Sequence, residues 1–128
     1  FAQRGLIAEH GISWLLPHLV GPAHSLDLLL SARKFTAAEA ERMGLINKVF
    51  EQETFMGAVM DYANTLAETV SPRSMAVMKA QIWKALFQNF NDALKVGDSE
   101  MQKSFATADF KEGVASFVER RAPAFQGK

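Results

Sequence analysis

Helix breakers divide this 128-residue chain into short segments with a helical apolar pattern. Gly21-Pro22, Ser71-Pro72 and Ala122-Pro123 each interrupt a run in which apolar residues recur every three or four positions. The pattern predicts helices over residues 12–20, 23–32, 54–70, 72–87 and 91–107. We therefore expect a mostly α-helical chain. Its helices are shorter than those of a typical isolated bundle, which indicates that they evolved to pack against further structure.

Local capping signals complete the predicted secondary structure. Thr36 and Glu39 form a capping-box pattern at the start of a short helix that ends at Gly44. Residues 45–50 alternate weakly and include a β-branched pair, so we expect a short strand that pairs with residues 33–35, the single β element of the chain. Asp109 is expected to cap a last helix over residues 110–120, followed by a loose tail.

Composition excludes several classes of function. The 14 basic and 14 acidic side chains balance, which argues against a nucleic-acid partner or a basic membrane-surface patch. No apolar run approaches the roughly 20 residues of a membrane span. The chain has no cysteine, so it has no disulfide, no thiolate nucleophile and no cysteine-based metal site. These features fit a reducing compartment, and we expect a cytoplasmic protein.

Glu9 is the strongest catalytic candidate, because it is the one carboxylate in an apolar turn flanked by Gly5 and Gly11. Burial among neighbours such as Leu6 and Ile7 would raise the pKa of Glu9 toward neutrality and suit it to moving protons. The alternative is that Glu9 caps the helix that starts near Gly11, where a negative charge is favourable. Pattern alone favours the capping alternative.

Gly11 and Trp14 follow Glu9 closely. Gly11 permits close backbone approach, so the helix-terminal N–H groups beside it could face a polarised oxygen, although an ordinary turn glycine is the alternative. Trp14 lies among leucines, and we expect it to pack in a core. The three histidines, His10, His18 and His24, do not have the spacing of a metal triad, so no metal is expected.

A pair of arginines makes the C-terminal end locally basic. Arg120 and Arg121 directly precede Ala122-Pro123. Such a pair could hold a phosphate group. The more common role of cations at this position is to complement the C-terminal end of a helix.

Four stretches together resemble the crotonase superfamily, the enoyl-CoA hydratases and isomerases. They are Arg4-Gly-Leu-Ile-Ala-Glu-His-Gly through Gly21, residues 32–49, Ser71-Pro72 through Lys79, and residues 105–125 with the sequence Phe-Val-Glu-Arg-Arg-Ala-Pro-Ala-Phe at their end. The resemblance covers nearly the whole chain in the family's order. It implies a spiral of ββα units followed by a helical C-terminal region. The chain also begins at Phe1 without a methionine, so we expect the second half of a larger enzyme.

The resemblance implies different roles for the two parts of the chain. Residues 1–50 correspond to the end of the crotonase core, and residues 51–128 to the helical region that forms trimer contacts and a lid. The family's oxyanion hole uses two backbone N–H groups, one of them in a segment that would precede Phe1. Coenzyme A thioester is the substrate, so no separate cofactor is implied. A homo-oligomer, a trimer or hexamer, is the expected assembly.

The resemblance also implies roles for individual residues. Glu9 matches the catalytic acid of isomerase-type members in a Gly-Leu-x-Pro-Asp/Glu-x-Gly turn, with Ala8 in place of the proline. Two-glutamate hydratases carry one of their glutamates four residues before the glycine that matches Gly5, and Phe1 stands there in this chain, which favours a single-acid isomerase or a hydratase of looser chemistry. Arg120 matches a basic residue that contacts coenzyme A phosphate. Together with Gly11 and Trp14 it completes the set of expected substrate-binding residues.

Two hypotheses therefore follow from the sequence. In the first, the parent protein is an acyl-CoA enzyme in which Glu9 carries a proton or activates water, and the isolated chain is inactive. In the second, this segment is a non-catalytic helical oligomerisation module.

Overall fold

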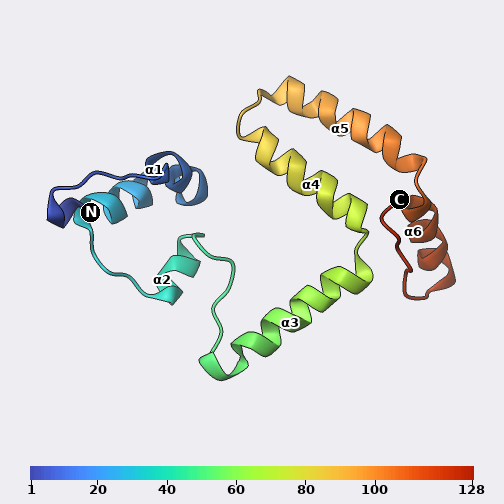
Figure 1. The fold of residues 1–128 in the computed structure, drawn as a ribbon, viewed down its shortest axis with the longest axis horizontal. Coiled ribbons are helices and arrows are strands. Elements are labelled where there is room, and N and C mark those ends of the chain that lie inside the picture. Colours follow the sequence, from blue (N-terminus) through green and yellow to red (C-terminus); the bar gives the residue numbers. More distant parts are fainter. The chain divides into compact units, whose positions relative to one another are not determined.

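A computed structural model describes all of residues 1–128 and contains helices but no strands (Figure 1). The elements are η1 (Ala2–Arg4), α1 (Ile12–Ser31), α2 (Ala37–Arg42), α3 (Gln52–Thr69), α4 (Pro72–Ala85), α5 (Phe90–Phe105) and α6 (Ala108–Glu119). The mostly α-helical fold class is therefore confirmed. The chain divides into two compact units, residues 1–55 and residues 56–128. The roles assigned to residues 1–50 and 51–128 stay predictions.

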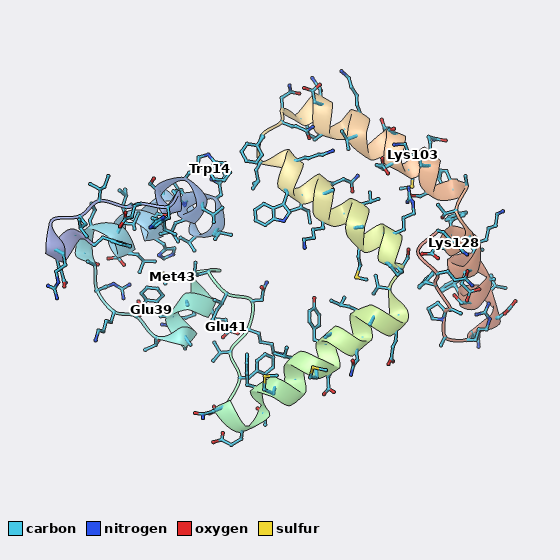
Figure 2. All side chains as sticks on the ribbon, in the orientation of Figure 1. Trp14, Glu39, Glu41, Met43, Lys103 and Lys128 are labelled. Atoms are coloured by element: carbon cyan, nitrogen blue, oxygen red, sulfur yellow. The ribbon has the colours of Figure 1, made fainter.

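The expected strand over residues 45–50 is wrong. The backbone N–H of Leu45 donates to the Ala40 carbonyl at 2.9 Å and closes the C-terminal end of α2. Further along, the N–H of Val49 donates to the Glu41 carboxylate, also on α2, at 3.1 Å (Figure 2 labels Glu41). Because these donors are bonded to α2, they are not available for a ladder with a second strand.

The core of the first unit lies along a kinked α1. Gly21 has φ 77° and ψ 164°, so the helix is two segments, residues 12–20 and 22–31, and the break predicted at Gly21-Pro22 is confirmed. Glycine is suited to this position because it adopts positive φ without steric cost. The apolar residues that the unit buries are Leu16, Val20, Leu28 and Ala40. Met43 and Leu45, which follow α2, pack against the three α1 residues of this set.

An ion-pair network joins the end of α1 to α2. The Arg33 guanidinium donates to Asp27 at 2.8 and 3.1 Å and approaches a Glu39 oxygen at 2.7 Å. Thr36 caps α2 as predicted, because its hydroxyl accepts the Glu39 N–H at 3.2 Å. The Glu39 carboxylate, however, pairs with Arg33, and that hydrogen bond lowers the pKa of Glu39. The guanidinium thus links two acids, Asp27 of α1 and Glu39 of α2.

In the second unit, α4 and α5 form an antiparallel hairpin, and α6 contacts α5 (Figure 1). Arg73 on α4 donates to the Ser104 hydroxyl of α5 at 2.8 Å and approaches Glu100 at 3.4 Å. Ser71 caps α4 through the Ser74 N–H, directly ahead of Pro72 at the first helical position. The boundary predicted at Ser71-Pro72 is therefore confirmed.

The buried carboxylate of Asp109 has a different role from the predicted one. Thr107, not Asp109, caps α6, since its hydroxyl accepts the Phe110 N–H at 3.1 Å. Asp109 is only 4% exposed and accepts the Ser71 hydroxyl at 2.5 Å. It also accepts the backbone N–H groups of Gln126 and Gly127 at 2.8 and 3.1 Å. The Ser71 hydroxyl, aided by these N–H groups, holds the pKa of Asp109 below its usual value.

The C-terminal tail is consequently not loose, and that prediction is wrong. Besides the two N–H groups held by Asp109, the Lys128 carbonyl accepts the Asp109 N–H at 3.0 Å. Figure 2 shows Lys128 beside α6. The Ala124 N–H donates to Glu112 at 2.8 Å. The tail is ordered because four of its backbone groups have partners on α6.

Much of the apolar surface of the helices is uncovered. The predicted inward face of α3 is open, with Phe55 48%, Val59 37% and Tyr62 68% exposed, and α3 contains no buried residue. In α6, Phe117 is 85% exposed. Contiguous exposed apolar surface of this kind marks interaction sites. None of the helices is long and apolar enough to span a bilayer.

We predict that Asp109→Ala releases the end of the tail. Without the carboxylate, the Gln126 and Gly127 N–H groups lose their acceptor, and their hydrogen-exchange protection falls by roughly tenfold or more. The Ala124 N–H, which Glu112 accepts, is the internal control and keeps its protection. Unchanged exchange at residues 126 and 127 would contradict the assigned role of Asp109.

Candidate active site

The candidate catalytic acid lies in a turn directly ahead of α1. Two consecutive residues, His10 (φ 55°) and Gly11 (φ 77°), adopt left-handed backbone conformations. The turn is closed by the Ile12 N–H, which donates to the Glu9 carbonyl at 3.2 Å. A left-handed histidine is a strained conformation, and such strain is typical of functional positions. The turn thus places Glu9 beside the N-terminal end of a helix.

The Glu9 carboxylate is open to solvent in this chain. Its side chain is 48% exposed, and the His10 Nε2 lies 3.9 Å from one carboxylate oxygen with an imidazole that is 87% exposed. The apolar neighbours expected to cover it, Leu6 and Ile7, are 54% and 81% exposed. The apolar environment that would tune this acid is therefore not formed by residues 1–55.

The capping alternative for Glu9 is not supported by hydrogen bonding. Gly11 is the N-cap of α1, and no side chain accepts a hydrogen bond there. The Gly11 carbonyl instead accepts the N–H groups of Trp14 and Leu15 at 3.1 and 3.0 Å. The Glu9 side chain is therefore not held in a capping hydrogen bond at this helix end, and its carboxylate is available to exchange a proton.

Trp14 does not pack in the core of this chain, which corrects the sequence-based expectation. It lies on α1 and is 41% exposed (Figure 2). Its ring stacks on His18 one turn later, with centroids 4.1 Å apart, and the Trp14 carbonyl is 2.7 Å from His18 Nδ1. The indole is thus partly covered by His18 and partly exposed to solvent.

The two arginines at the end of α6 differ in their surroundings. Arg121 pairs with Glu112 and Glu119, and its side chain is 41% exposed. Arg120 is exposed, and its guanidinium has no hydrogen bond or ion pair within the chain. Of the two, only Arg120 is free to bind an anion. Arg120 belongs to the second unit and Glu9, Gly11 and Trp14 to the first.

Sequence reasoning missed the pairing of Arg121 with Glu112. These residues are nine positions apart, which is not a helical spacing, and the chain must turn at the end of α6 before they meet. Hydrogen bonds from Arg121, with one from the Ala124 N–H, lower the pKa of Glu112 to about 2.

No group of three His, Cys, Asp or Glu side chains could hold a metal ion.

A family described as enoyl-CoA hydratase/isomerase matches residues 1–128. The chain therefore belongs to this family, and it has the helical C-terminal part of the crotonase fold. Its relatives include 1,2-epoxyphenylacetyl-CoA isomerase of Escherichia coli, which is 30% identical over all of this chain and 48% of its own length. The trans-2-decenoyl-acyl-carrier-protein isomerase of Streptococcus mutans is 31% identical, again over all of this chain and 48% of its length.

A solved structure supports the same relationship. A protein described as a probable enoyl-CoA hydratase/isomerase from Mycobacterium abscessus superposes with a TM-score of 0.93 at 27% identity. The match covers 99% of this chain and 50% of that protein. The chain thus spans about half the length of the relatives that it matches.

We predict that Arg120→Gly stabilises the chain. Arg120 has φ 54° and ψ 42°, a left-handed conformation that costs an L-residue about 1 kcal/mol and glycine almost nothing. The free energy of unfolding in denaturant is expected to rise by about that amount. The control Lys111→Gly, inside α6, should lower it by about 1 kcal/mol instead. A destabilised Arg120→Gly variant would refute strain at this position.

We predict a pH dependence that originates in Glu112. Its pKa is about 2 in the folded chain against an ordinary value of 4.5, so its contribution to stability is complete above 4.5 and is lost as pH falls toward 2. Denaturant unfolding at a series of pH values should show a declining free energy of unfolding through this window. In Glu112→Gln the decline is shallower, and an identical decline would contradict the assignment.

Proposed function

We propose that the intact protein containing this chain hydrates or isomerises the double bond of an enoyl-CoA thioester, with Glu9 as the acid/base residue. The observation that carries the proposal is the strained turn that presents the Glu9 carboxylate at the N-terminal end of α1. The family match supplies the reaction class. The names of the relatives, which include isomerases of CoA and carrier-protein thioesters, support a thioester substrate.

In an isomerisation, Glu9 takes a proton from the carbon next to, or beyond, the thioester carbonyl. The electron pair of the broken C–H bond moves onto the thioester oxygen as an enolate, which backbone N–H groups stabilise. Glu9 then returns the proton to another carbon, and the double bond shifts. In a hydration, Glu9 instead takes a proton from water as the water oxygen bonds to the far carbon of the double bond, and the electron pair of that double bond moves onto the thioester oxygen as an enolate. Glu9 then returns the proton to the carbon next to the carbonyl, which completes the addition. Phe1, in place of a second acid, favours isomerisation.

Arg120 is proposed to bind a phosphate group of coenzyme A. Its guanidinium is exposed and unpaired, and arginine recognises phosphate with two parallel hydrogen bonds. Gly11 and Trp14 are proposed to contact the substrate near Glu9, Gly11 through the adjoining helix N–H groups and Trp14 through its exposed indole face. No cofactor besides the substrate thioester is required by this chemistry.

The second candidate function is a helical oligomerisation module. The uncovered apolar side chains of α3 and α6 favour it, because such surfaces form subunit contacts. The two functions coexist if the intact protein is a homo-oligomeric enzyme and the isolated chain is inactive. A cytoplasmic location, expected from the lack of cysteine, is part of the same proposal.

Glu9→Gln in the intact protein tests the assignment. Glutamine keeps the shape of the side chain but cannot exchange a proton, so turnover of enoyl-CoA thioesters should fall by about 10²–10⁴ with little change in thermal stability. The matched control is Glu51→Gln, an exposed acid of the same unit, which should leave turnover unchanged. Unaltered turnover in Glu9→Gln would remove Glu9 from the mechanism. An intact wild-type protein without any turnover would favour the oligomerisation module.

A further inference from the structure

The end of α6 combines a strained residue with a closely bonded neighbour. The backbone N–H of Arg121 donates to the Ser116 carbonyl at 3.0 Å, and the backbone N–H of Arg120 donates to the Phe117 carbonyl at 3.3 Å. This is the hydrogen-bond pattern of a Schellman motif, in which the left-handed position is usually glycine. Here that position is Arg120, at φ 54°. A stable turn would not require arginine there, so the cost of the conformation points to a use for its side chain.

The left-handed turn is held by the side chain of Arg121. Its Nη1 and Nη2 donate to the two oxygens of Glu112 at 2.5 and 2.9 Å, and its Nε donates to Glu119 at 2.6 Å. The same Nη1 also donates to the Ala122 carbonyl at 3.1 Å. The Arg121 guanidinium therefore bonds to two carboxylates of α6 and to the Ala122 carbonyl, which follows α6.

Glu112 completes the clamp around Arg120. Besides Arg121, its carboxylate accepts the Ala124 N–H at 2.8 Å, so two residues that follow the turn are tied to one side chain in the first half of α6. Neither acid of the network pairs with Arg120, which leaves that guanidinium available. Of the two adjacent arginines, Arg121 is thus bonded within the chain and Arg120 is not.

We propose that Arg121 is a positioning residue for coenzyme A recognition: by clamping Glu112 and Glu119, it holds the strained turn that presents Arg120 to a phosphate of the substrate. This inference rests on the proposed function, because it presumes a coenzyme A thioester. Loss of the clamp lets Arg120 return to a relaxed backbone conformation, and the phosphate contact weakens without any change at Glu9. The clamp therefore acts on binding of the nucleotide portion and not on the chemical step.

The test uses two substrates of the intact protein that carry the same enoyl group, a coenzyme A thioester and a pantetheine thioester, which has no phosphate. The variants are Arg121→Lys, which keeps the charge but loses the fork, and Glu112→Gln, which removes the ion pair. Each should raise KM for the coenzyme A thioester about tenfold, with kcat unchanged. Neither KM nor kcat for the pantetheine thioester should change. The Kd of free coenzyme A, measured by calorimetry, should rise by the same factor.

A control variant and the remaining outcomes distinguish failure of the positioning role from failure of the proposed reaction. Lys95→Gln, on α5, removes one exposed positive charge and should leave all these constants unchanged. A merely structural role for Arg121 would lower kcat/KM equally for both substrates, and that result would overturn the proposal, as would an unchanged KM in both variants. If the wild-type protein binds coenzyme A but turns over neither thioester, the proposed reaction fails, and the calorimetric comparison alone decides the positioning role. If it does not bind coenzyme A, both proposals fail.

Discussion

The second unit depends on one buried carboxylate. Asp109 is 4% exposed, and an ionised carboxylate is stable at that depth only when donors satisfy it. The Ser71 hydroxyl comes from the start of α4, and the N–H groups of Gln126 and Gly127 come from the tail. Because one side chain collects donors from segments far apart in the sequence, it fixes the start of α4, the start of α6 and the chain end together.

The candidate acid and the apolar faces of the helices are both exposed to solvent. Glu9 lies among apolar residues that remain exposed, and the apolar face of α3 is likewise open. Proton transfer to a thioester benefits from a site that excludes water, since electrostatic stabilisation weakens in bulk solvent. The turn around Glu9 is thus formed within this chain, while the Glu9 side chain and its apolar neighbours stay exposed.

The ends of α1 and α6 illustrate how strain and charge are combined. His10 beside Glu9 and Arg120 beside Arg121 are both left-handed residues other than glycine. Each lies next to a candidate functional group, and each is held by backbone hydrogen bonds at a helix end. Their conformations cost free energy that neighbouring contacts offset. At α6 the offsetting contacts are ion pairs of Arg121, and Arg120 beside it is left without an ion pair.

The sequence by itself determined the helices, because helix signals are local. The breaks at Gly21-Pro22 and Ser71-Pro72 and the cap at Thr36 follow from residues within one turn, and all are present. Residue motifs likewise determined the family. Only the tertiary structure determined which groups pair in hydrogen bonds and which side chains are buried. Val49 bonds to α2 and so forms no strand, Asp109 binds the tail, and Trp14 remains half open. Such choices depend on groups that only folding brings together, so no local pattern encodes them.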